Sequence, residues 1–299
     1  MATWLRRHPV LGGFILMFAC TWPIDLWAAA DSHGWTALHI PPVLQLLVGY
    51  GFVVAALIAT GVVDGRAGIR TLLRRFLIWR VGLRWYAVVL LGFAVVDLTA
   101  IALYVFFGGA VPDFARPFAV EIMPPGTNLW AAAPLFLLFG AFTNGEEIGW
   151  RGYALPRLQT RHGALRASVV IGVVWAFWHI PKFLTAGSAQ DYSFWLYLVD
   201  TVAKAVLFTW VFNSTAGSLL MVTLLHASLN TSAVFLPILP AAVGDVGPTM
   251  ISIVLHCAAA VAVVLATGPA RLSRTSSPAD QPQDSVKNVP RPPGPGQTG

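Results

Sequence analysis

The sequence has 299 residues, of which 57% are hydrophobic and 11% are charged, and its mean hydropathy is +0.70. Soluble globular domains are about 45–50% apolar and about 25% charged. The composition therefore excludes a soluble globular protein and predicts a polytopic membrane protein. The net charge of +6 does not indicate nucleic-acid binding, because the basic residues lie beside apolar segments and form no domain of their own.

Windows of roughly 18–25 apolar residues, the length at which a helix crosses a bilayer, occur about eight times along the chain. The predicted fold is all-α, a polytopic membrane helical bundle of about eight transmembrane helices within residues 1–268. The first span is too long, and too embedded in a multi-span chain, for a cleaved signal peptide. The expected spans are Val10–Ala29, Val43–Val63, Tyr86–Phe107, Leu129–Gly149, Ala167–Leu184, Phe194–Phe212, Ser218–Leu239 and Met250–Thr267.

Sixteen arginines and three lysines carry the positive charge, and most of them lie in alternate loops. The positive-inside rule therefore predicts that both termini and the Arg-rich segments face the cytoplasm. The residues concerned are Arg6, Arg7, Arg66, Arg70, Arg74, Arg75, Arg80, Arg84, Arg157, Arg161, Arg166, Arg271, Arg274, Lys287 and Arg291.

Two segments outside the spans have a distinct composition. Arg66–Arg84 interleaves arginines with apolar residues near helical spacing, which predicts a basic amphipathic helix at the cytoplasmic headgroup level. Residues 269–299 contain seven prolines and few apolar side chains, which predicts a disordered cytoplasmic tail. No internal repeat is evident, so an inverted-repeat transporter gains no support.

Adjacent carboxylates follow the fourth apolar run, in the sequence Asn144-Gly-Glu-Glu-Ile-Gly-Trp-Arg151. Carboxylates next to hydrocarbon are costly unless they are paired, protonated or used in chemistry. Glu147 and Arg151 are four residues apart on one helical face, with the acid on the favourable N-terminal side. Glu146 lies about 100° around the helix and is left free of that pair. A purely structural Glu–Arg pair would account for Glu147 and leave Glu146 without a role.

Two histidines occur in later spans, His179 in Trp175-Ala-Phe-Trp-His-Ile-Pro181 and His226 in His226-Ala-Ser-Leu-Asn230. We expect Trp175 to stack on His179 from the preceding turn, and Pro181 to bend or end that helix. His226 and Asn230 are four residues apart and share one face. A free glutamate, two histidines and an asparagine in separate spans are costly unless they converge, so we expect a shared polar cavity.

The expected depths of these groups disagree. If the fifth span starts near Ala167, His179 lies about 18 Å deep, whereas Glu146 lies near the cytoplasmic end of the fourth span. We therefore expect the fourth helix to continue past Arg151 toward Leu155 and to end at Pro156, which places Glu146 deeper. Asp200 and Lys204 are also four residues apart, and we expect them to pair with each other.

These motifs resemble those of the CPBP family, which includes the type II CAAX prenyl endopeptidases and the bacterial bacteriocin-processing and self-immunity (Abi) proteins. The resemblance covers roughly Gly140–Asn230 within a core of roughly 127–240. It rests on Glu146-Glu147-x-x-x-Arg151, an aromatic-x-x-x-His motif from Trp175 to His179, and His226-x-x-x-Asn230. The family motif usually has Phe where this chain has Trp175. The Arg-rich segment after the second span is typical of bacterial members, which implies a bacterial cell membrane.

The resemblance implies an intramembrane endopeptidase that takes a peptide or protein substrate, lipidated or otherwise associated with the membrane, from the cytoplasmic side. It implies that Glu146, helped by His179, activates a water, and that His226 and Asn230 stabilise the oxyanion. Glu147 and Arg151 complete the candidate site. Partial burial suits a carboxylate base, and oxyanion donors of this kind contribute about 3–4 kcal/mol in a known protease.

Two questions stay open at the level of sequence. The chain lacks His-Glu-x-x-His, although Glu146, His179 and His226 together could make a three-ligand zinc site; we favour a metal-independent mechanism. The competing functional class is a non-catalytic membrane protein, either a proton-coupled transporter that uses Glu146 and the histidines as a relay or an immunity protein.

Overall fold

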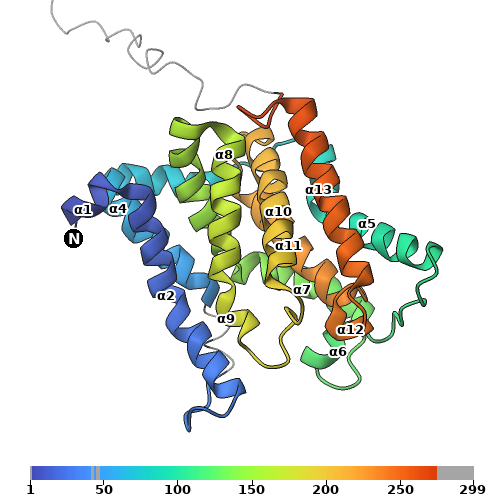
Figure 1. Ribbon diagram of the computed structural model, residues 1–299. Coiled ribbons are helices and arrows are strands. Elements are labelled where there is room, and N and C mark those ends of the chain that lie inside the picture. The colour runs from blue at the N-terminus through green and yellow to red at the C-terminus, as the bar shows by residue number, and fades with distance from the viewer. Residues whose placement is uncertain (1, 42–43, 45–47, 275–299) are drawn as a thin grey trace, which may run out of the picture.

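The structure is a computed structural model that describes residues 2–41, 44 and 48–274. Every element in the described ranges is helical, which confirms the all-α membrane bundle (Figure 1). The helices are α1 Ala2–Arg7, α2 Pro9–Ser32, α4 Val48–Arg74, α5 Leu83–Phe106, α6 Ala119–Ile122, α7 Leu129–Thr143, α8 Leu155–Trp178, α9 Ile180–Phe183, α10 Phe194–Ser214, α11 Leu219–Phe235, α12 Pro240–Val243 and α13 Gly247–Thr267, with a 3₁₀ turn η1 Arg75–Leu77 and a π-helix η2 Ile148–Ala154.

Six described helical segments are long and apolar enough to cross a membrane: those of α2, α4, α5, α10, α11 and α13. The other two expected spans also fall on helices, but these do not meet both conditions. Helix α7 has only 15 residues, and α8 begins with a charged and polar stretch, Leu155-Pro-Arg-Leu-Gln-Thr-Arg161. The length and composition of these six segments support an integral membrane protein.

The helices pack around α10 and α11. In Figure 1, α8, α10 and α13 stand side by side with α10 in the middle, and α11 packs against α5 and α7. Helix α2 packs against α4 at the other side of α8. The main apolar core includes Phe52, Trp150, Tyr153 and Phe208, none of which is exposed to solvent. Trp150 and Tyr153 belong to η2, directly after Glu146 and Glu147, so this segment is part of the main core.

The fourth expected span is interrupted immediately before the glutamates. Helix α7 ends at Thr143, and helical structure resumes at Glu146, where the Asn144 side chain accepts a hydrogen bond from the Glu146 amide (3.1 Å). An asparagine in this position caps a new helix. The predicted end of the span at Gly149 is therefore wrong, because the glutamates belong to the next helix.

That next helix also continues further than expected. It runs through η2 and Pro156 and breaks only at Gly163, whose φ of 71° is left-handed and suits glycine. Pro156 directly follows the π-helix η2, a local irregularity in the helix of the kind found where a proline is accommodated. The prediction that Pro156 ends the helix is therefore wrong, whereas continuation past Arg151 is correct.

Gly163 divides this region into two arms that run in opposite directions. Glu146 lies 17 residues before Gly163 and His179 lies 16 residues after it. At about 1.5 Å per helical residue, both arms return to a similar depth. The disagreement in depth found in the sequence is thereby resolved.

Several basic segments lie at one end of the bundle. Contacts there join the N-terminal segment, the end of α4, the start of α8, the end of α10 and the segment after α13. These contacts are Arg6 Nε to the Val62 carbonyl (2.9 Å), the Arg157–Asp64 ion pair, the Arg75 guanidinium 5.3 Å from the Phe212 ring centre, and the Ala164 amide to the Ala270 carbonyl (2.9 Å). We call this the Arg-rich end.

Two predictions about non-spanning segments need revision. The basic helix expected over Arg66–Arg84 follows a break at Gly65 and ends with η1 at Leu77, so Ile78–Gly82 is a loop before α5. Of the expected tail, residues 269–274 pack against the bundle, and Leu272 is completely buried. Residues 275–299 lie outside the described part of the chain.

The first prediction concerns membrane topology. In a background with Cys20 and Cys257 replaced by alanine, Thr3→Cys and Arg80→Cys should react with a maleimide only when it reaches the cytoplasm, since both lie at the Arg-rich end. Leu38→Cys, beyond the far end of α2, should react with an impermeant maleimide in intact cells. Labelling of Thr3→Cys and Arg80→Cys from opposite faces would contradict the arrangement.

Candidate active site

Close backbone packing positions the start of the glutamate helix. A Cβ added to Gly145 would lie 2.3 Å from the Gly49 carbonyl oxygen, and one added to Gly49 would lie 2.4 Å from the Thr143 carbonyl oxygen. Only glycine permits such an approach of two backbones. Helix α4 therefore supports the break at residues 144–145, so that Glu146 and Glu147 begin the new helix inside the bundle.

Glu147 lies at the centre of a buried ionic network. Its Oε1 accepts from Arg151 Nη1 at 2.9 Å and from His226 Nδ1 at 2.8 Å. The side chains of Glu147 and Arg151 are completely buried, and that of His226 is 4% exposed. The expected Glu147–Arg151 pair is present, and the contact with His226 was not anticipated.

The Glu147 contact fixes how His226 presents its other nitrogen. A carboxylate only accepts hydrogen bonds, so Nδ1 of His226 carries the donated proton. Nε2 then points toward Glu146, whose Oε1 lies 3.9 Å away. Two adjacent carboxylates therefore contact opposite nitrogens of one imidazole.

Aromatic rings surround the Arg151 guanidinium. Its central carbon lies 4.4 Å from the Phe208 ring centre and 4.9 Å from that of Trp175. Nε and Nη2 of Arg151 have no hydrogen-bond partner among the described residues. The faces of these two rings stabilise the Arg151 charge electrostatically where it lacks hydrogen bonds.

Glu146 is held by indole groups and takes no part in the arginine pair. Its Oε2 accepts from Trp175 Nε1 at 2.9 Å and from Trp150 Nε1 at 3.3 Å. The side chain is 12% exposed. The expectation that Glu146 is free of Arg151 is correct, and its second oxygen is left for another contact.

His179 lies at the end of α8, and helix α9 begins one residue later at Ile180. Its Nδ1 contacts the Trp175 carbonyl at 3.0 Å, and the rings of Trp178 and Tyr197 lie 4.6 and 5.1 Å from its own. Trp175 contacts His179 as expected, but the ring centres are 6.2 Å apart and the planes are tilted by 57°, so the rings do not stack. Trp175 also lies edge-on to His226, at 5.3 Å.

A cavity of about 280 Å³ joins the two later motifs. His179, His226 and Asn230 all line it, as does Trp175. Asn230 is exposed and has no hydrogen-bond partner among the described residues, so its amide is available. Glu146 contacts Trp175 and lies 3.9 Å from His226, so it adjoins the cavity wall.

Lys204 also lines this cavity and belongs to a second polar network. Lys204 Nζ pairs with Asp200 Oδ2 at 2.6 Å, which confirms the expected pair, and the other Asp200 oxygen contacts His256 Nδ1 at 2.9 Å. Sequence reasoning missed Lys204 as a cavity residue and His256 as its indirect partner. No local signal marks a contact between α10 and α13.

The described residues contain no cluster of three His, Cys, Asp or Glu side chains placed to hold a metal ion. His226 uses Nδ1 on Glu147, and His179 directs Nδ1 at a carbonyl. Nε2 of each histidine takes no part in these contacts, an orientation that metal-bound histidines also adopt.

Two comparisons with known proteins gave matches, and the family match has bounds that include the site. Residues 126–232 match the family described as type II CAAX prenyl endopeptidase Rce1-like. The chain is 29% identical over 176 residues to a Methanococcus maripaludis protein called CAAX prenyl protease 2; the match covers 55% of this chain and 61% of that protein. Both matches support the family that the motif resemblance indicated.

The ionic network predicts different stability effects for the two glutamates. Glu147→Gln should lower the free energy of unfolding by about 3–5 kcal/mol, because it leaves the buried Arg151 charge uncompensated. Glu146→Gln should change it by less than about 1 kcal/mol, since an amide oxygen can accept the same indole N–H groups. Thermal unfolding in detergent measures both. Equal losses of stability in the two variants would contradict a structural role for Glu147 and a non-structural role for Glu146.

Proposed function

We propose that this protein belongs to the type II CAAX prenyl endopeptidase family and is a membrane-embedded endopeptidase that uses Glu146 to activate water against a peptide carbonyl. The observation that carries the proposal is the pair of contacts on His226, with Glu147 on Nδ1 and Glu146 facing Nε2. The proposed substrate is a peptide segment presented at the membrane.

Glu146 is the proposed general base. Its Oε2 is held by two indole N–H groups, which leaves Oε1 to take a proton. The 3.9 Å between Oε1 and His226 Nε2 is too long for a direct hydrogen bond and suits a water that contacts both. The water oxygen would attack the carbonyl carbon while Glu146 takes its proton. The C–N bond then breaks, and the proton passes to the leaving amine.

His179 is the proposed partner of Glu146 in positioning the water. Its Nδ1 contacts the Trp175 carbonyl, and the ring lines the cavity. A neutral histidine held in this way carries its proton on Nδ1 and offers Nε2 as an acceptor. The Trp178 and Tyr197 rings hold its plane.

Asn230 and His226 are the proposed oxyanion donors. The Asn230 amide is exposed in the cavity, and His226 precedes it by one helical turn. Because Nδ1 of His226 donates to Glu147, donation from Nε2 requires an imidazole protonated on both nitrogens. Glu147 is then the counter-charge of the donor, and Arg151 anchors Glu147. No step in this mechanism passes through a metal ion.

The central test is the identity of the cleaved peptides. Proteomics of free C termini, in cells with the wild-type protein or with Glu146→Gln, should reveal termini that need the carboxylate. With a substrate found in this way, Glu146→Gln should lower kcat by about 10³-fold or more. Most of the wild-type activity in Glu146→Gln would contradict the base assignment.

The oxyanion assignment predicts losses in the chemical step. His226→Ala and Asn230→Ala should each lower kcat by about 10²–10³-fold with a modest change in KM. Asn230→Asp should be at least as damaging, because it places negative charge where negative charge develops. Loss of activity on chelation, restored by zinc, together with loss of bound metal in His226→Ala, would instead make His226 a ligand.

Trp175 offers a test specific to this chain, since the family motif usually has phenylalanine there. Trp175→Phe keeps an aromatic ring and removes the N–H that lies 2.9 Å from Glu146. We expect kcat to fall by roughly 10- to 150-fold with KM unchanged, which corresponds to the loss of one hydrogen bond to a carboxylate, about 1.5–3 kcal/mol. Trp195→Phe, at a ring that is 69% exposed, is the matched control. Equal effects of the two substitutions on kcat would contradict the role of the Trp175 N–H in positioning Glu146.

A measurement of proton flux distinguishes the protease from the alternative function, a non-catalytic proton-coupled transporter. In liposomes, a relay through Glu146 and the histidines would acidify the interior under a pH gradient, whereas the protease would show cleavage without flux. Proton flux in the wild type that is lost in Glu146→Gln, with no new C termini in cells, would favour the transporter.

A further inference from the structure

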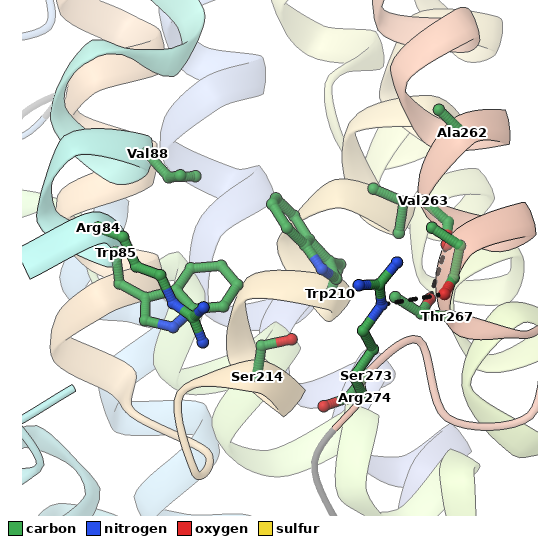
Figure 2. A pocket seen from close by; sticks show the side chains of 11 residues that line it. Arg84, Trp85, Val88, Trp210, Ser214, Ala262, Val263, Thr267, Ser273 and Arg274 are labelled. Atoms are coloured by element: carbon green, nitrogen blue, oxygen red, sulfur yellow. Dashed lines mark hydrogen bonds between the residues drawn. The ribbon is translucent and has the colours of Figure 1, made fainter. Parts of the chain in front are cut away.

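A groove at the Arg-rich ends of three helices, separate from the catalytic cavity, carries the further inference. It has a volume of about 430 Å³ and lies between the start of α5 and the ends of α10 and α13. Figure 2 shows the side chains of these three helices, together with Ser273 and Arg274, around the space. None of these residues belongs to the proposed catalytic site.

The groove combines an apolar body with a basic rim. Val88, Trp210 and Val263 are among the residues that line its apolar part, whereas Arg84 and Arg274 supply positive charge. Both arginines are exposed, and the lining contains no aspartate or glutamate. Neither arginine forms an ion pair with a described residue. An occupant with a negatively charged head and an apolar body would complement both parts.

Local contacts hold the rim in place and leave donors available. Arg274 uses Nε on the Ala266 carbonyl, at 3.3 Å, so its remaining guanidinium N–H groups are free of that bond. The Arg84 guanidinium lies 5.6 Å from the Trp85 ring, and Trp85 packs edge-on against Trp210 at 5.0 Å. The Ser214 hydroxyl lines the groove and donates to no described residue.

The groove lies where lipid headgroups are expected, which indicates the kind of molecule that occupies it. Helices α5, α10 and α13 all qualify as membrane spans by length and composition, and the groove lies at their Arg-rich ends. Arginine and tryptophan at the ends of spanning helices meet lipid headgroups. We propose that the groove binds one anionic glycerophospholipid, with its phosphate between Arg84 and Arg274, its ester near Ser214 and an acyl chain along Val88, Trp210 and Val263.

Native mass spectrometry of the full-length protein tests whether the two arginines bind the lipid phosphate. The probes are phosphatidylglycerol, phosphatidylcholine with the same acyl chains, and glycerol 3-phosphate. We expect one phosphatidylglycerol per chain, bound at least 10-fold more tightly than phosphatidylcholine, and no saturable binding of glycerol 3-phosphate. Arg84→Gln with Arg274→Gln should weaken phosphatidylglycerol binding by roughly 10- to 30-fold, the effect of two arginines near a membrane surface.

The matched control is Arg66→Gln with Arg70→Gln, which removes the same charge from exposed arginines outside the groove. Equal weakening in the two double variants would mean general surface attraction and would overturn the proposal. Equal affinity for the two phospholipids would also overturn it. So would phosphatidylglycerol binding that appears only after deletion of residues 275–299, because the groove would then be the site of this chain's own C-terminal segment.

A second pair of variants tests whether the apolar part of the groove holds the acyl chain. Ala262→Trp fills the apolar part of the groove, whereas Val261→Trp adds the same ring at a neighbouring position that is 58% exposed and does not line the groove. Phosphatidylglycerol binding should fall by at least 10-fold in Ala262→Trp and stay within 2-fold of wild type in Val261→Trp. Unchanged binding in a folded Ala262→Trp protein would overturn the proposal.

Discussion

The buried Glu147 carboxylate is the constraint on which the rest of the site depends. A charge removed from solvent must be compensated by partners inside the fold, and Glu147 meets this requirement through Arg151 and His226. Arg151 in turn needs the faces of Trp175 and Phe208. This single group thus fixes the relative positions of η2, α8, α10 and α11. Because Arg151 donates to Glu147 and not to Glu146, Glu146 is left with neutral donors and an oxygen that faces His226.

The backbone meets this constraint by breaking one span and folding another back. Asn144 and Gly145 end α7 inside the bundle, and the close approach of Gly49 and Gly145 leaves no room for a side chain. The helix that follows reaches the Arg-rich end, breaks at Gly163 and returns to His179. Two arms of similar length thereby bring Trp175 within hydrogen-bond distance of Glu146, 29 positions away in the sequence. Irregular backbone within a membrane protein is tolerated where other protein covers it, and α4 provides that cover here.

The sequence predicted the helical class, the membrane location, the Glu147–Arg151 and Asp200–Lys204 pairs, and the family, because each depends on composition or on spacing within one helix. It did not predict the contacts of Glu147 with His226, Trp175 with Glu146, or Asp200 with His256. These join different helices, and no periodicity records which faces meet. The end of α7 was misplaced because hydropathy continues through Ile148 and Trp150, whereas the break depends on a capping side chain and a backbone approach. Trp175 was expected to stack on the nearer histidine in sequence, yet its ring lies closer to that of His226.

The central claim is that Glu146 activates a water molecule and does not itself attack the peptide. A single turnover in H₂¹⁸O, followed by mass spectrometry of both the product and the digested protein, tests this most directly. The account predicts one ¹⁸O atom in the new C-terminal carboxylate and none in the peptide that contains Glu146. Appearance of ¹⁸O in the Glu146 carboxylate would indicate a covalent acyl intermediate and would contradict the account.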